Sequence, residues 1–211
     1  GADVVLLATI GQLARMFGIG EVALIGGAWN PIGGHNLLEA ARLLTEVQRV
    51  AVVSGFFIPS AMKPETDGPP GAAALGAAVF VHPWEMMGRD DMPKYWLPWL
   101  VGMPAETMRA LCSVVMGGVL ERLPQLRIAF AHGGGSLAAT WGRVVHGHAV
   151  RPDLCAQQNP RSPADYLGRF YVDSLTHDAD TLRQLIKMLG AERVALGSDY
   201  PFPLGEAVPG A

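Results

Sequence analysis

Cysteine, charge and long apolar runs are all scarce in this sequence of 211 residues. Its two cysteines, Cys112 and Cys155, exclude a disulfide framework and a four-cysteine zinc site, and a reducing cytoplasm is the expected location. Charged residues make up only 17% of the chain, the formal net charge is -3, and Lys and Arg form no runs, which argues against nucleic-acid binding. No segment reaches the length of a membrane span, and residues 1–8 lack the features of a secretory signal, so we expect no membrane partner.

What remains is the composition of a globular protein. Hydrophobic residues make up 50% of the chain, enough to bury a substantial core in one domain or two small ones. After residue 76, apolar runs alternate with segments of helical periodicity. Strands are predicted at 77–82, 127–132, 169–174 and 193–199, and helices at 104–122, 136–148 and 178–189. This alternation implies parallel strands, in an open doubly wound sheet or a (β/α)8 barrel, and we favour the barrel.

Three of the predicted strands end in an ionisable side chain: His82, His132 and Asp199. Taken singly, such a histidine is usually a hydrogen-bonded loop residue, and such an aspartate usually caps a helix or forms a turn. Together they offer the ligands of a zinc-like ion, at the barrel edge where catalytic groups gather. Because glycines follow His132 and leave it open to approach, we assign it to proton transfer, and we assign His82 and Asp199 to the metal.

The amino-terminal segment predicts a different kind of site. Short strands are expected at 3–8 and 21–27, and a glycine- and proline-rich loop at 28–36 leads into a leucine-rich helical pattern. Strand, glycine loop and helix can bind phosphate, although any strand-to-helix turn uses glycine. The stretch VALIGGAWNPIGGHNLLEAA resembles the carboxy-terminal half of the 3-deoxy-manno-octulosonic acid transferases of lipid A biosynthesis. This resemblance, within the first 43 residues, implies a nucleotide-sugar site formed by Gly33, Gly34, His35, Asn36 and Glu39.

We expect a boundary between the two parts of the chain. Residues 49–57 form a further predicted strand, and residues 58–71 have the proline and glycine content of a linker. The predicted division is a glycosyltransferase-like βα fragment at 1–45, a strand and linker at 46–75, and a barrel portion at 76–211. The expected fold class is α/β, a partial (β/α)8 barrel preceded by a short unrelated βα segment.

Four blocks in the carboxy-terminal part are distinctive: FVHPWEMMGRDDMPKYWLPWLVGMPAET, IAFAHGGG, GRVVHGHAVRPDLCA and VALGSDYPFPLGE. They resemble the 2-amino-3-carboxymuconate-6-semialdehyde decarboxylases of the amidohydrolase superfamily. The resemblance implies a zinc-dependent, non-oxidative decarboxylase of tryptophan and nitroaromatic catabolism, built on a distorted (β/α)8 barrel. It implies that His82 and Asp199 bind zinc, that Asp199 also takes part in proton transfer, and that His132 is the general acid/base.

The same resemblance implies a substrate site shared between subunits. Arg143 and Arg151 would be the arginines that reach the carboxylates of a small dicarboxylate substrate from a neighbouring subunit of a homodimer, and Trp96 would line the pocket. Guanidinium groups suit such a substrate because they pair with carboxylates bidentately. Without the family, a solvated helix face and a loop would explain both arginines. Asp173 and Asp178 are expected to be loop, core or capping groups.

One departure from the family pattern concerns the metal. The family's H-x-H pair at the end of the first barrel strand is missing, and His35 is the only histidine before residue 76. His146 and His148 have that spacing, but they lie on or just after a predicted helix and are excluded as the pair. His177 is expected to be a loop, core or capping group. We therefore expect a fusion or fragment with an incomplete zinc site and an impaired decarboxylase. The alternatives are a nucleotide-sugar-binding module and a non-catalytic α/β fragment that oligomerises to cover its open edges.

Overall fold

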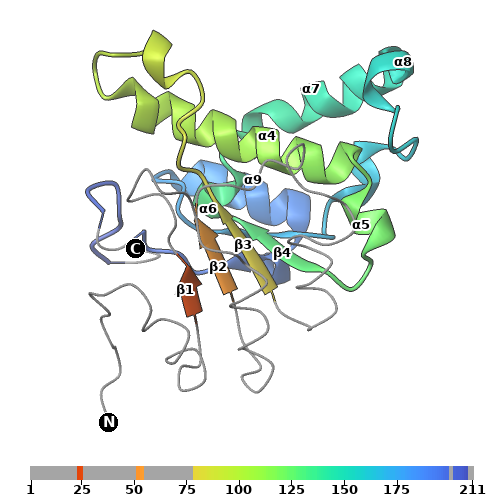
Figure 1. Cartoon of the computed structure of the whole chain (residues 1–211). Coiled ribbons are helices and arrows are strands. Elements are labelled where there is room, and N and C mark those ends of the chain that lie inside the picture. Colours follow the sequence, from red (N-terminus) through yellow and green to blue (C-terminus); the bar gives the residue numbers. More distant parts are fainter. Residues whose placement is uncertain (1–22, 26–50, 55–77, 200–201, 209–211) are drawn as a thin grey trace, which may run out of the picture.

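The computed structural model describes residues 23–25, 51–54, 78–199 and 202–208. Within these residues, six parallel strands form one sheet, in the order β1-β2-β3-β4-β5-β6. The strands are β1 (Ala23–Ile25), β2 (Ala51–Ser54), β3 (Ala78–His82), β4 (Arg127–Phe130), β5 (Tyr171–Asp173) and β6 (Val194–Ala195). Figure 1 shows β1 to β4 side by side and pointing the same way.

The strand order decides between the two folds that the sequence allows. A doubly wound sheet reverses its strand order at a switch point, whereas here each described strand pairs with the next one along the chain. Consecutive parallel strands are the arrangement of a (β/α)8 barrel wall, so the predicted barrel type is confirmed. Because β2 pairs with both β1 and β3, the sheet runs across the predicted boundary at residue 75. The division into three parts stays a prediction.

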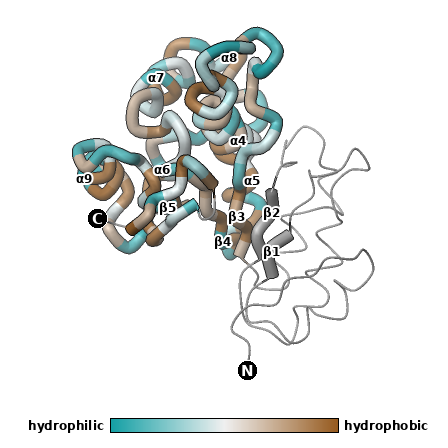
Figure 2. The backbone as a smooth tube through the Cα atoms, turned by 90° about the vertical axis from the view of Figure 1, so that its left-hand side faces the viewer, coloured by the Kyte–Doolittle hydropathy of each residue, from teal (hydrophilic) through white to brown (hydrophobic). Residues whose placement is uncertain are grey.

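Helices pack on the sheet, and α4, α7 and α9 gather on one side of the described strands (Figure 2). The helices are α4 (Met103–Met116), α5 (Val119–Arg122), α6 (Ala131–Gly134), α7 (Leu137–Val150), α8 (Pro152–Cys155) and α9 (Ala179–Leu189), with shorter turns η3 (Arg89–Asp91), η4 (Pro98–Gly102), η5 (Pro163–Tyr166) and η6 (Ala191–Arg193). Asp178 caps α9, as expected, by accepting a hydrogen bond from the Thr181 backbone N–H at 2.7 Å. In the described part of the chain, no helix has the length and apolarity of a membrane span.

Three predicted elements end earlier than expected. One is the strand predicted at 193–199, which ends at Ala195 as β6, so Asp199 lies in the loop beyond it. The helix predicted at 104–122 is divided into α4 and α5, because Gly118 has a φ of 67°, a left-handed conformation that interrupts a helix. The strand predicted at 127–132 ends at Phe130, because His132 has a φ of 56° and leaves the strand direction. The predictions at 3–8, 28–36 and 58–71 lie outside the described residues.

The core lies between the sheet and the helices. On β3, Val79 and Val81 are buried, and on β4 the buried positions are Ile128 and Phe130, which join the same hydrophobic cluster as the apolar face of α4. Alternate residues of a strand point to opposite faces, so the side chain of His82 leaves β3 on the face away from the helices. That face is the interior side of a barrel, where the site is built.

Candidate metal site

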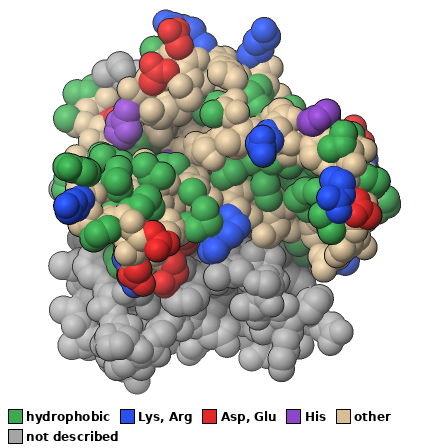
Figure 3. All heavy atoms as spheres, turned by 90° about the horizontal axis from the view of Figure 1, so that it is seen from above, with side chains coloured by type: hydrophobic (Ala, Val, Ile, Leu, Met, Phe, Trp, Pro, Cys, Tyr) green, Lys and Arg blue, Asp and Glu red, His purple; other side chains and the backbone are tan. Residues whose placement is uncertain are grey.

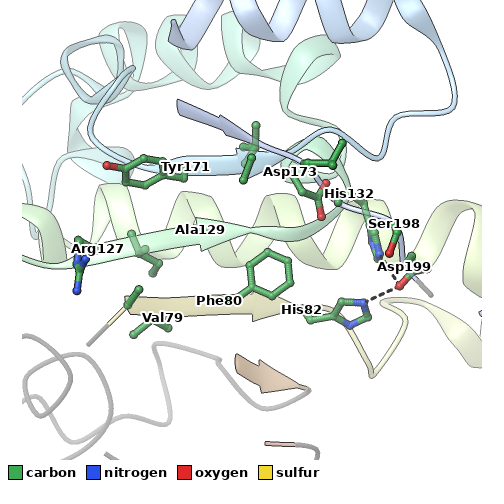
Figure 4. Close-up of a pocket in the computed structure, with 16 residues that line it drawn as sticks. Val79, Phe80, His82, Arg127, Ala129, His132, Tyr171, Asp173, Ser198 and Asp199 are labelled. Carbon is green, nitrogen blue, oxygen red and sulfur yellow. Dashed lines mark ion pairs between the residues drawn. The ribbon is translucent and has the colours of Figure 1, made fainter. Parts of the chain in front are cut away.

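The three predicted site residues meet at the carboxyl edge of the sheet. His82 is the last residue of β3, His132 follows β4, and Asp199 follows β6. Oδ1 of Asp199 lies 3.5 Å from Nε2 of His82 and 3.7 Å from Nε2 of His132. The two imidazole rings meet edge to face, with centroids 4.8 Å apart. Figure 4 shows the three side chains converging beyond the strand ends.

Left-handed backbone brings His132 into this cluster. His132 has φ 56° and ψ 50°, and Gly133, Gly134 and Gly135 follow with φ values of 60°, 77° and 69°. Asp199 also has a positive φ, of 51°. Such conformations are costly for residues with a side chain and are concentrated at functional sites. The glycines are therefore needed to make the turn, as well as to leave the imidazole accessible.

A hydrogen bond determines which nitrogen of His82 faces the cluster. Its Nδ1 lies 2.9 Å from the carbonyl oxygen of Pro83. Because a carbonyl oxygen only accepts, Nδ1 carries the proton, and in the neutral ring Nε2 keeps its lone pair toward Asp199. A histidine that binds metal through one nitrogen usually donates the other N–H in this way.

The Asp199 carboxyl group is ionised at neutral pH. Burial by itself would raise its pKa, but hydrogen bonds and charge from His132 and His82 outweigh the burial and lower the pKa well below the usual value. The cluster therefore contributes a full negative charge, which suits a cation.

The donor set fits a divalent metal ion. The ligand atoms of His82, His132 and Asp199 all lie within 4.8 Å of one another, and no other group of this kind occurs among the described residues. Imidazole nitrogen and carboxylate oxygen are ligands of zinc and of neighbouring divalent metals.

Two cavities open beside the cluster, and the three residues line both of them. One, of about 560 Å³, runs along the sheet face and is shown in Figure 4. The other, of about 490 Å³, is mostly apolar and is walled by the aromatic side chains of Trp84, Trp96, Trp99 and Phe202. An apolar cavity with a few convergent polar groups is typical of small-molecule binding sites.

A buried aspartate fixes the strand ends that carry the cluster. Asp173 closes β5, and its Oδ1 accepts hydrogen bonds from the N–H groups of Gly133 at 2.8 Å and Leu175 at 3.2 Å. Gly197 lies so close that a Cβ added there would be 2.7 Å from Cβ of Asp173, and its N–H donates to Ser174 Oγ at 3.2 Å. The loops after β4 and β6 are thus held against β5.

The amidohydrolase family profile matches residues 71–211, which is more than half of the chain. The chain belongs to the amidohydrolase family. Residues 28–82 also match the family described as D-glutamate cyclase-like, C-terminal. The predicted nucleotide-sugar residues, Gly33, Gly34, His35, Asn36 and Glu39, fall in that second segment and outside the described residues, so the transferase interpretation stays a prediction.

Curated relatives of this amidohydrolase chain include three 2-amino-3-carboxymuconate-6-semialdehyde decarboxylases. The protein from Dictyostelium discoideum is 62% identical over 136 residues, which cover 64% of this chain and 38% of the relative. The Caenorhabditis elegans protein is 52% identical over 133 residues, with coverages of 63% and 33%. The Sus scrofa protein is 35% identical over 133 residues, with coverages of 63% and 52%. The chain therefore spans between 33% and 52% of the length of these relatives.

Solved structures support the fold. The dihydroxybenzoic acid decarboxylase of Polaromonas sp. JS666, solved with bound manganese and the inhibitor 2-nitroresorcinol, matches with a TM-score of 0.64 and 23% identity, over 82% of this amidohydrolase chain and 57% of that one. The 5-carboxyvanillate decarboxylase of Sphingomonas paucimobilis matches with a TM-score of 0.64 and 22% identity, over 78% of this chain and 53% of that one. At these identities the likeness shows a shared fold.

The two predicted substrate arginines lie away from both cavities. Arg143 is exposed on α7, and Arg151, which follows α7, makes a bidentate contact with Asp153 at 2.9 and 2.7 Å. Neither lines a cavity beside the cluster. His146 and His148 lie on α7, as expected, and His148 is buried with Nε2 3.3 Å from the carbonyl oxygen of Asn159.

The sequence alone did not indicate that Glu106 is buried or that His177 lines a cavity beside the cluster. His177, expected as a loop, core or capping group, lines the 490 Å³ cavity and has a φ of 55°. Glu106 is buried in the first turn of α4. Acidic residues are common in the first turn of a helix, and nothing in the sequence distinguishes a buried acidic residue from an exposed one.

Proposed function

We propose that this chain carries the metal centre of a non-oxidative decarboxylase that acts on a small unsaturated dicarboxylate. The observation that supports it is the His82–His132–Asp199 cluster at the mouth of an apolar, aromatic-walled cavity of about 490 Å³. The relatives named as 2-amino-3-carboxymuconate-6-semialdehyde decarboxylases suggest that compound as the substrate. Zinc is the proposed ion, and the manganese of the Polaromonas enzyme makes Mn²⁺ the alternative.

Each residue has a defined task in this proposal. His82 and Asp199 would hold the ion, which when bound polarises a substrate oxygen and stabilises negative charge there. Decarboxylation breaks the bond between a carbon atom and its carboxylate, releases CO₂ and leaves the bonding electrons on that carbon, which then takes up a proton. His132 can give this proton from Nε2, because this nitrogen faces the cluster and lies 3.7 Å from Asp199 Oδ1.

The aromatic wall would position the substrate. Trp96, 41% exposed, stacks on Trp99 with ring centroids 5.8 Å apart, and both side chains line the cavity. Flat, rigid side chains of this kind suit a conjugated substrate, because they bury its faces and keep water from the reacting carbon.

The substrate carboxylates would be bound by a second copy of the chain. Arg143 and Arg151 are exposed, so a partner in a homodimer could receive them. The segment that forms part of the cavity wall also exposes Tyr95 at 81% and Leu100 and Val101 at 48% each. Figure 3 shows hydrophobic side chains gathered on the face seen from above, with acidic and basic groups scattered around them. Exposed apolar surface rimmed by polar groups is typical of protein interfaces.

Metal content and CO₂ release test the proposal. The full chain would be loaded with Zn²⁺ or Mn²⁺, and bound metal and CO₂ release from 2-amino-3-carboxymuconate-6-semialdehyde would be measured. His82→Ala and Asp199→Ala should lose the metal, whereas His146→Ala, on the exposed part of α7, should keep it. Equal metal in all variants, or none in the unmodified chain, would refute the proposed centre. Bound metal without CO₂ would support the expectation of an impaired enzyme.

A further inference from the structure

Glu106 is a buried carboxylate to which the proposed function assigns no task. It lies in the first turn of α4 and is 9% exposed. Its Oε1 accepts hydrogen bonds from the N–H groups of Trp84 and Glu85, at 3.2 Å each, and its Oε2 accepts one from the N–H of Met86 at 2.5 Å. Three consecutive amides of the loop that follows His82 therefore converge on one side chain.

The loop needs support to keep this shape. Met86 has a φ of 56°, a conformation that a residue with a side chain keeps only when its surroundings impose it. Gly102, directly before α4, lies close enough that a Cβ added there would be 3.0 Å from the carbonyl carbon of Met86. The start of α4 and the loop after β3 are thus in direct contact, with the Glu106 carboxylate as their polar link.

The same turn of α4 also touches the loop of His132. The carbonyl oxygen of Pro104 accepts a hydrogen bond from the Ser136 N–H at 3.3 Å. A Cβ added to Gly135 would lie 2.2 Å from this oxygen, so the two backbones are already as close as glycine allows. The first turn of α4 therefore touches the loops after His82 and after His132, and Glu106 links it to the loop after His82.

We propose that Glu106 is a positioning residue of the metal centre. Its carboxylate directs the chain after His82 and so sets where His82 Nε2 lies relative to Asp199 and His132. An ionised carboxylate suits this task because it offers only acceptors, whereas the amide of glutamine would turn a donor toward N–H groups. Trp84 and Met86 also line the 490 Å³ cavity, so the same contact shapes the substrate wall. The inference rests on the proposed function of the cluster.

The test compares Glu106→Gln with Glu121→Gln, a matched change in an exposed side chain on α5 that pairs with the Arg161 guanidinium at 3.1 Å. Affinity for Zn²⁺ is measured by competition with a chromophoric chelator. Glu106→Gln should bind Zn²⁺ about 10- to 100-fold more weakly, as is usual when a group that orients a metal ligand is removed. Glu121→Gln should match the unmodified chain, and Glu106→Asp, which keeps two acceptor oxygens, should recover part of the loss.

A second measurement, on the metal-free chain, separates this inference from the proposed function. In Glu106→Gln, the amides of residues 84–86 should exchange faster and the ring resonances of His82 should shift. If the unmodified chain binds no metal, the proposed function fails, and these two signals still decide the role of Glu106. Unchanged signals, or unchanged Zn²⁺ affinity, would overturn the inference. Unfolding of both Glu106 variants while Glu121→Gln stays folded would also overturn it, because Glu106 would then be needed for stability alone.

Discussion

Gly135→Ala should destabilise the protein by about 2–6 kcal/mol, through two costs that add. Gly135 has a φ of 69° and a ψ of -118°, a conformation that is almost exclusive to glycine and costs another residue about 1–3 kcal/mol. The added Cβ would lie 2.2 Å from the Pro104 carbonyl oxygen and 2.9 Å from Cβ of Thr107. Because the first is a backbone atom that cannot rotate away, the overpacking adds about 1–3 kcal/mol.

Urea unfolding followed by circular dichroism measures this cost, with Gly142→Ala as the control. Gly142 lies in the middle of α7, and a Cβ added there would meet no atom within 4 Å. Alanine should therefore stabilise the protein at that position, by about 0.5–1 kcal/mol, since glycine is the poorer helix former.

The experiment depends on the two substitutions changing the free energy of unfolding in opposite directions. If Gly135→Ala unfolded within about 0.5 kcal/mol of the unmodified chain, a range usual for surface changes, the loop of His132 would not be held against α4 as described. If both substitutions destabilised the protein alike, the effect would be a general one of glycine, and the close approach to Pro104 would not be its cause.

Three further predictions concern single side chains. Asp173→Ala leaves two buried N–H groups without their acceptor and should lower the free energy of unfolding by about 2 kcal/mol or more in the same assay, while a change below about 0.5 kcal/mol would contradict the role of Asp173. Burial raises the pKa of the Cys112 thiol to about 11, so iodoacetamide at pH 8 should modify Cys112 only after unfolding, and rapid modification of the folded chain, seen by peptide mass spectrometry, would refute this. Hydrogen bonds from Thr181 lower the pKa of Asp178, so its stabilising effect is present above about pH 4 and is lost as pH falls through the lower folded pKa. Asp178→Asn should therefore flatten the acid side of the stability curve, and an unchanged curve would count against the cap.

The grouping of His82, His132 and Asp199 could be predicted because it follows from strand ends. An apolar run that stops at a histidine or an aspartate identifies a strand and a side chain at or just beyond its carboxyl end, and parallel strands bring these ends to one edge. His82, His132 and Asp199 are 117 residues apart from first to last, yet the alternation of strands and helices was enough to place them together. Side-chain alternation along β3 likewise sends Val79 and His82 to opposite faces.

Other features depend on contacts that no local pattern encodes. The turn at His132 is possible because Gly135 can lie against Pro104, and the conformation of the loop after His82 depends on Glu106, 20 residues beyond Met86 in the chain. A carboxylate at a helix start has the same sequence context whether it faces water or three buried amides. Periodicity and strand ends thus determine the α/β class and the members of the cluster, because they are short-range properties, whereas the strand order shows the barrel type. Only tertiary packing decides which groups hold that cluster in place, since hydrogen-bond partners are chosen by distance in space.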